Sequence, residues 1–116
     1  MLHQALLKRF GGQGGLRDQG LLESALARPR SGYYTTISEQ VAALMQSLAL
    51  NRSFVDGNKR VAFAMTAIFL RMNGWRFIVT ADEGEAFLIT KVIQGKAEVK
   101  EMATWIEGKM KVLKTS

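Results

Sequence analysis

The groups in this chain that are best suited to binding phosphate are gathered in one short stretch, Asp56-Gly57-Asn58-Lys59-Arg60. The next ten residues, 61–70, are apolar at all positions but one. A helix that is apolar on every side is expected to lie in the middle of the fold. Its first amides lack intrahelical partners and would lie at the Asp-Gly-Asn turn, at the positive end of the helix dipole.

This helix start has the chemistry of an anion site. Gly57 carries no side chain that would keep an oxygen-rich ligand away from the amides. Lys59 and Arg60 add two cations at the end of the helix where the dipole disfavours positive charge, and this indicates a bound anion such as a phosphate. The alternative interpretation is an ordinary helix start with two solvated basic residues.

Helical periodicity recurs on both sides of this stretch. Apolar residues at intervals of three and four predict helices over residues 2–10, 18–28 (capped by Asp18), 38–51 (capped by Ser38), 80–94 (capping box of Thr80 and Glu83) and 97–107. The helix that follows the polar stretch should span about Asn58 to Met72, end at Asn73-Gly74 and be the most buried. Residues 75–79 read as an extended segment, which cannot form a sheet alone, and residues 109–116 as a frayed tail. The sequence therefore predicts an all-α fold, a compact bundle of about six helices around a buried central helix.

Composition places the chain among ordinary globular proteins. Its 116 residues predict one domain over 1–116, and the 47% of apolar residues argue against disorder. There are no cysteines, which fits a reducing compartment, and no apolar run approaches the roughly 20 residues of a membrane span. We therefore expect a cytoplasmic protein with no membrane contact. The net charge of +6 is spread along the chain, which makes a direct nucleic-acid partner unlikely but favours acidic partners and nucleotides.

The segment 52–60, RSFVDGNKR, resembles the signature His-x-Phe-x-Asp-Gly-Asn-Lys-Arg of the Doc (death on curing) toxins, a branch of the Fic superfamily. Six specified positions match, from Phe54 to Arg60, and the first does not, because Arg52 stands where the family has histidine. Residues 15–29 resemble a second segment of Doc proteins, and the resemblance covers nearly the whole chain. Doc relatives usually have a short stretch before the segment that matches residues 1–10, so the first helix is expected to be truncated.

The resemblance implies a kinase that transfers the γ-phosphate of ATP to a threonine of elongation factor Tu and so blocks translation. It implies Asp56 as the Mg²⁺ ligand, Gly57 and Asn58 as phosphate-binding groups, and Lys59 and Arg60 as cations that neutralise the transferred group. It also implies an antitoxin partner with an acidic, helical C-terminal segment. Fic proteins proper usually have glycine at the position of Lys59 and transfer a nucleotidyl group, so a Fic-type AMP transferase is the alternative. A catalytically dead module that binds a nucleotide or a partner is another.

Arg52 removes the group that the family uses as the general base. An arginine has no acceptor, and its pKa above about 12 keeps it protonated at physiological pH. The resemblance therefore implies an inactive form, and the substitution is either natural or a change that disarms a toxic enzyme. The intact remainder of the signature favours the second origin. Residues 30–37 correspond to a flap that positions the target chain in Fic-type folds, or else form a loop whose tyrosines pack on the core.

Overall fold

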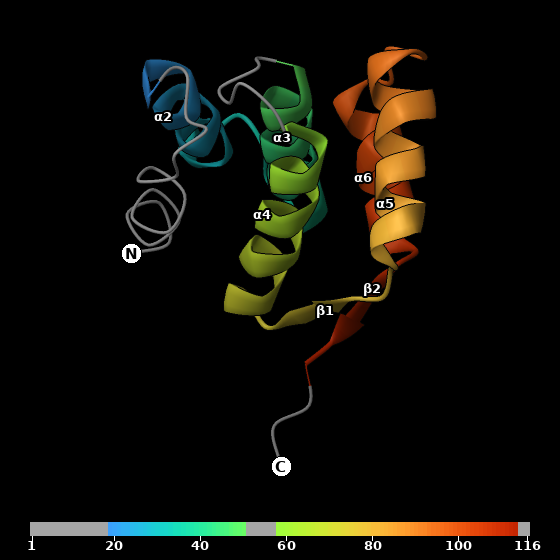
Figure 1. Cartoon of the computed structure of the whole chain (residues 1–116). Coiled ribbons are helices and arrows are strands. Elements are labelled where there is room, and N and C mark those ends of the chain that lie inside the picture. Colours follow the sequence, from blue (N-terminus) through green and yellow to red (C-terminus); the bar gives the residue numbers. More distant parts are fainter. Residues whose placement is uncertain (1–18, 51–57, 114–116) are drawn as a thin grey trace.

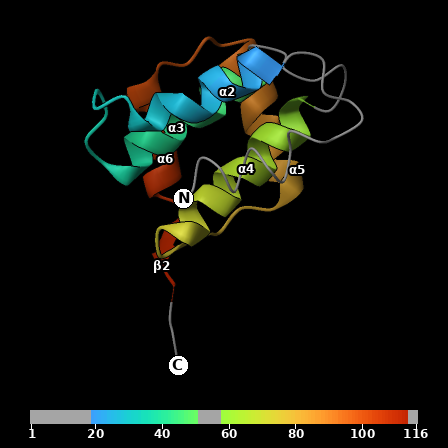
Figure 2. The same cartoon turned by 90° about the vertical axis from the view of Figure 1, so that its left-hand side faces the viewer.

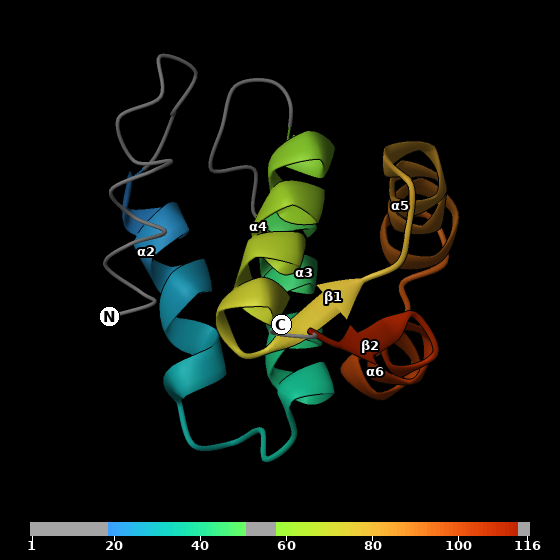
Figure 3. The same cartoon turned by 90° about the horizontal axis from the view of Figure 1, so that it is seen from below.

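Two helices with long apolar stripes, α3 (Ile37–Leu50) and α4 (Asn58–Met72), lie against each other in the computed structural model of the chain (Figure 1). The structure describes residues 19–50 and 58–113. Helix α2 (Gln19–Ala27) lies on one side of this pair, and α5 (Ala81–Phe87) and α6 (Val99–Glu107) lie on the other (Figure 3). The described ranges thus contain five α-helices, and the predicted helical fold is confirmed.

Short elements complete the described chain. A 3-10 turn, η1 (Arg28–Arg30), follows α2, and Pro29 lies within it, where proline is compatible with the first turn of a helix. Helix α5 continues directly into a π-helical segment, η2 (Leu88–Ile93), so the helix predicted over residues 80–94 is present but changes its hydrogen-bonding pattern halfway. Helix α6 begins at Val99, two residues later than predicted, because Glu98 lies in extended conformation and serves as its N-cap.

The core is shared by α2, α3, α4, η2 and α6. Its largest fully buried side chains are Leu22, Val41, Leu44, Met45, Leu48, Met65, Leu70, Leu88, Val92, Met102 and Ile106. None of the residues 61–70 is exposed, as predicted, but several are only half-buried. The longest buried run in the described part of the chain is 41–45 of α3, which α2, α4 and α6 contact. The prediction that α4 would be the most buried helix is therefore wrong, because α3 lies between more neighbours.

A two-stranded antiparallel ribbon corrects two predictions. Strand β1 (Trp75–Phe77) follows α4, and strand β2 (Met110–Val112) follows α6 and pairs with it. Residues 109–113 are therefore not a frayed tail, and the extended segment after α4 is not an isolated strand. The partner strand is more than thirty positions away in the chain, so local sequence patterns could not indicate the pairing. Residues 114–116 lie outside the described part.

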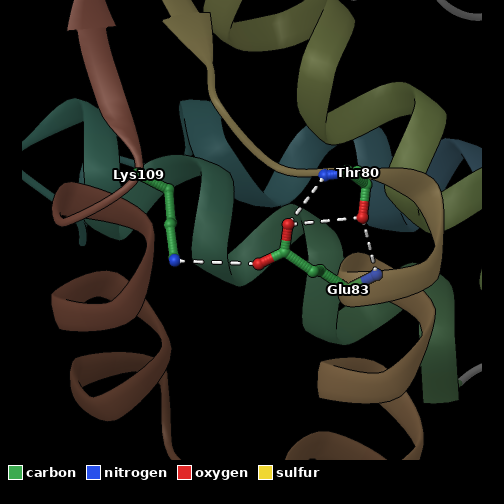
Figure 4. Close-up of polar contacts among 3 residues, drawn as sticks. All are labelled: Thr80, Glu83 and Lys109. Atoms are coloured by element: carbon green, nitrogen blue, oxygen red, sulfur yellow. Dashed lines mark hydrogen bonds and ion pairs between the residues drawn. The ribbon is translucent and has the colours of Figure 1, made fainter.

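The capping predictions had mixed outcomes. The box at the start of α5 is confirmed, because the Glu83 amide donates to Thr80 Oγ1 at 3.1 Å and the Thr80 amide donates to Glu83 Oε1 at 3.3 Å (Figure 4). Ser38 does not cap α3. The Glu39 amide donates instead to Thr36 Oγ1 at 3.1 Å, and Ser38 is buried with its hydroxyl donating to Glu107 Oε2 at 2.8 Å. Ser38 therefore joins α3 to the end of α6.

The end of α4 is formed as predicted. Gly74 has a φ of +86°, the left-handed conformation that commonly closes a helix, and its amide donates to the Arg71 carbonyl at 3.1 Å. The caps at Asp18 and the helix over residues 2–10 lie outside the described residues. Within residues 19–50 and 58–113, no helix is long and apolar enough to cross a membrane.

Gly84 sets the distance between α5 and α4. A Cβ atom at this position would overlap the Phe63 ring of α4. We therefore expect Gly84→Ala to lower the free energy of unfolding by about 1–3 kcal/mol, the usual effect of overpacking. Gly108→Ala is the matched control, since Gly108 has a helical φ of −66° and an added Cβ would make only ordinary contacts. Denaturant unfolding of the three proteins tests this, and equal midpoints for Gly84→Ala and the parent chain would contradict the packing described.

Glu39 gives the start of α3 a dependence on pH. The Thr36 amide and hydroxyl and the Thr35 hydroxyl donate to its carboxylate, and these bonds lower the pKa of Glu39 below its ordinary value. A carboxyl with a lowered pKa stabilises the folded state above its ordinary pKa of about 4.5, and that contribution disappears as the pH falls through the folded-state pKa. Glu39→Gln should therefore melt at a lower temperature than the parent chain at pH 7, with the difference shrinking below pH about 4. A difference in melting temperature that is constant with pH would exclude this contribution.

Candidate active site

The start of α4 presents two cations to solvent. Lys59 and Arg60 lie in the first turn of this helix, and both side chains are exposed. Asn58 is the first residue of the helix, as the sequence predicts. The last three residues of the signature therefore belong to α4. The first-turn amides of an α-helix lack intrahelical acceptors and carry the positive end of the dipole. This end of α4 therefore adds two full positive charges to a partial positive charge.

No carboxylate in residues 19–50 or 58–113 forms an ion pair with either cation. The ion pair found in that part of the chain joins Lys109 Nζ and Glu83 Oε2 at 3.9 Å, beside the start of α5 (Figure 4). Lys59 and Arg60 are thus not neutralised by the described acidic residues, and the field at the start of α4 favours an anion.

The first turn of α4 is held in place by the turn that follows it. Ala62 and Met65 are fully buried, and α4 packs along α3. Thr66 is also buried, and its hydroxyl donates to the Ala62 carbonyl at 2.8 Å, which satisfies the one polar side chain in the apolar part of the helix. The position of the two cations is therefore fixed by core packing one turn away.

Three of the predicted site residues, Arg52, Asp56 and Gly57, lie outside the described part of the chain. They belong to the connection that leaves α3 at Leu50 and enters α4 at Asn58. Their roles as replaced base, metal ligand and amide-exposing glycine remain predictions. Within the described residues there is no group of three or more histidine, aspartate or glutamate side chains that could hold a metal ion.

The predicted flap over residues 30–37 does not lie beside the start of α4. Its loop is at the opposite side of the molecule in Figures 2 and 3, next to the start of α3. The other interpretation holds for one of its two tyrosines. Tyr34 is half-buried, whereas Tyr33 is 82% exposed. This loop therefore cannot position a target chain at Lys59 and Arg60 in the conformation described.

Arg28 is a half-buried residue whose polar contacts sequence reasoning missed. Its guanidinium donates to Tyr34 Oη at 2.9 Å, Gln46 Oε1 at 2.9 Å and Ser47 Oγ at 2.8 Å, and it lies over the Tyr34 ring at 5.6 Å from the centroid. These bonds tie the end of α2 and the following loop to α3. The only signal in the sequence was that Arg28 lies in the second segment that resembles Doc proteins.

The sequence is similar to known proteins of one family. Residues 1–70 match the Fic/DOC family. The chain is 37% identical over 105 residues to a protein of Mycolicibacterium smegmatis named Toxin Doc, an alignment that covers 85% of this chain and 81% of that protein. It is 36% identical over 77 residues to a protein of Escherichia phage P1 named Protein kinase doc, with 63% of this chain and 61% of that protein covered.

The chain therefore belongs to the Fic/DOC family, and it is of the Doc type. This result confirms the family that the signature over residues 52–60 indicated. The family and the phage relative also support a phosphotransferase-type enzyme as the class of this protein.

Proposed function

We propose that this chain is the toxin of a toxin–antitoxin module and has the architecture of a protein kinase that uses ATP. The observation that carries the proposal is the exposed pair Lys59 and Arg60 at the start of α4, which no described carboxylate neutralises. The name of the phage P1 relative, Protein kinase doc, supports phosphoryl transfer as the chemistry. We propose a threonine of elongation factor Tu as the phosphate acceptor, so that translation is blocked.

The residues at the start of α4 would act by positioning and by neutralising charge, which are the main contributions in phosphoryl transfer. Lys59 and Arg60 would bind the oxygens of the triphosphate and offset the negative charge of the transferred group. Asn58 and the amides near Gly57 would hold further phosphate oxygens. Asp56 is the carboxylate of the signature and would hold Mg²⁺, since this ion is usually bound by one or two carboxylates together with phosphate oxygens.

Arg52 defines the catalytic state of this form. In the proposed reaction the attacking hydroxyl loses its proton to a base, and an arginine side chain has no free acceptor at physiological pH. Without that base the reaction would lose about 10² to 10⁴ in rate. The chain as printed would therefore bind nucleotide but transfer phosphate slowly.

A Fic-type nucleotidyl transferase is the second candidate, and the lysine at position 59 argues against it. Fic proteins proper usually have glycine there, and the additional cation in this chain would hold the triphosphate so that the γ-phosphate faces the acceptor. A catalytically dead binding module is the third candidate. We also propose an acidic antitoxin segment as the natural partner, because the net charge of +6 favours a salt-sensitive complex with it.

Restoration of the base tests the proposed function. Arg52→His should increase transfer of phosphate from ATP to purified elongation factor Tu at least about a hundredfold, because a general base contributes about 10² to 10⁴ in rate. Arg52→Gln is the matched control, since it removes the arginine charge without supplying a base. ATP labelled in the γ-phosphate and ATP labelled in the α-phosphate should be compared in the presence of Mg²⁺.

The two labels separate the candidates. The kinase is supported if elongation factor Tu acquires the γ-phosphate label but not the α-phosphate label, and only with the histidine form. Label from the α-phosphate identifies a nucleotidyl transferase. Equal inertness of the histidine and glutamine forms would identify a binding module, and full activity of the arginine form would show that the family mechanism does not apply.

A further inference from the structure

The outer face of the ribbon carries like charges in direct opposition. The register pairs Arg76 of β1 with Lys111 of β2, and both side chains are exposed. Directly opposite like charges destabilise a strand pair. No carboxylate of residues 19–50 or 58–113 forms an ion pair with Arg76 or Lys111. Lys109, two residues before Lys111, is paired with Glu83. The repulsion between Arg76 and Lys111 is thus not offset by a described carboxylate, and an acidic partner would relieve it.

A third cation lies beside this pair. Arg71, in the last turn of α4, is exposed and has no described ion-pair partner. Together with Trp75, Arg76 and Phe77 of β1 and Ala67 of α4, it lines a cavity of about 190 Å³. This is smaller than the roughly 300–1,000 Å³ of a typical small-molecule site. A cavity of this size between two arginines suits a single acidic side chain better than a whole ligand.

One edge of β1 is available for pairing. Among residues 19–50 and 58–113 the sheet has two strands, so the described part of the chain pairs with β1 on one side only, through β2. The Ile78 amide donates to the Lys109 carbonyl at 2.7 Å, and the Leu113 amide donates to the Gly74 carbonyl at 2.9 Å. In an antiparallel ladder the bonding groups alternate in direction. The backbone groups of Trp75 and Phe77 therefore point away from β2, toward the free edge of β1. The cavity is lined by residues of α4 and β1 and by none of β2.

Exposed apolar side chains occur on the ribbon and on the residues next to it. Met72, at the end of α4, is 52% exposed, Ile78 is 41% exposed and Val112 is 64% exposed. In Figure 1 the end of α4 and the ribbon form one end of the molecule. Cations, an open strand edge and apolar side chains thus occur together there, which is the combination that an extended peptide with alternating acidic and apolar residues would match.

We propose that the free edge of β1 binds an acidic peptide segment of a partner protein as an added strand, with a carboxylate of that segment between Arg71 and Arg76. This site is separate from the start of α4. The helix has 15 residues and so places its two ends about 22 Å apart at 1.5 Å per residue. A partner bound at the ribbon therefore leaves Lys59 and Arg60 accessible.

The described features favour a peptide over a nucleic acid. A free strand edge offers both amide donors and carbonyl acceptors, and a peptide backbone satisfies both, whereas phosphate oxygens satisfy only donors. Duplex DNA is bound through many phosphate contacts spread along a surface. The cationic cluster of the ribbon, Arg71, Arg76 and Lys111, is instead grouped around one short strand.

The test uses the full chain and synthetic peptides of about six residues, the usual length of a strand. One peptide alternates glutamate with valine, and its control has lysine in place of glutamate. We expect saturable binding of the acidic peptide alone in a calorimetric titration. Arg76→Glu should weaken that binding by at least about tenfold, and Arg30→Glu, which changes an exposed arginine of η1 by the same charge, should leave it within about twofold.

Hydrogen exchange distinguishes strand addition from simple charge attraction. The acidic peptide should slow exchange of the Trp75 and Phe77 amides, because both become donors to the added strand. Arg76→Gln is a second variant for use if Arg76→Glu is unfolded by circular dichroism, and it should also weaken binding. Binding without protection of these amides would overturn the proposal. Stronger binding of duplex DNA than of the peptide to the same residues, or self-association of the chain through this edge, would overturn it as well.

Discussion

The packing of α4 against α3 is the contact on which the site depends. Ala62 and Met65 are buried in the same core as α3, so the start of α4 has a fixed direction although the side chains of Lys59 and Arg60 are exposed. The connection that carries Arg52 and Asp56 is anchored at both ends by this helix pair. A phosphate site built mostly from cations and backbone amides requires such anchoring. The electrostatic stabilisation of the phosphate depends on where the cations and dipoles are held.

Most of the remaining fold supports this helix pair. Ser38 joins α3 to the end of α6 through Glu107, and Gln46 Nε2 donates to the Ala97 carbonyl at 3.1 Å, so α6 is tied to α3 near both of its ends. On the other side, the bonds of Arg28 hold the end of α2 to α3. Phe63 of α4 contacts Phe77 of the ribbon at a centroid distance of 5.9 Å. The ribbon is thus packed against the same helix whose start carries Lys59 and Arg60.

The sequence predicted those features that depend on neighbouring residues. The bounds of α4, the left-handed Gly74 and the capping box of Thr80 and Glu83 follow from local rules, and all three are present. The ribbon could not be predicted in this way, because Trp75 pairs with Val112, which follows α5 and α6 in the chain. Thr36 and Ser38 are both acceptable caps by composition, and the choice between them depended on Glu107, which lies 69 residues further along the chain.

The candidate site was predictable for a different reason. The order Asp56-Gly57-Asn58-Lys59-Arg60 combines a short motif with a helix start, so the placement of Asn58, Lys59 and Arg60 at the start of α4 follows once that helix is recognised. The structure adds that Lys59 and Arg60 are exposed and lack a described acidic partner. It also places the loop between α2 and α3 on the far side from the start of α4, which a pattern of tyrosines and threonines could not reveal.

The start of α4 is proposed to bind the phosphates of a nucleotide. A titration of the isotope-labelled chain with ATP and Mg²⁺, followed through the backbone amide resonances, tests this binding. We expect the largest saturable shifts at Lys59, Arg60 and the adjacent amides of the first turn, and little effect on residues of the ribbon. Shifts centred on Tyr33 and Glu39, or on β1 and β2, with none at the start of α4, would contradict it.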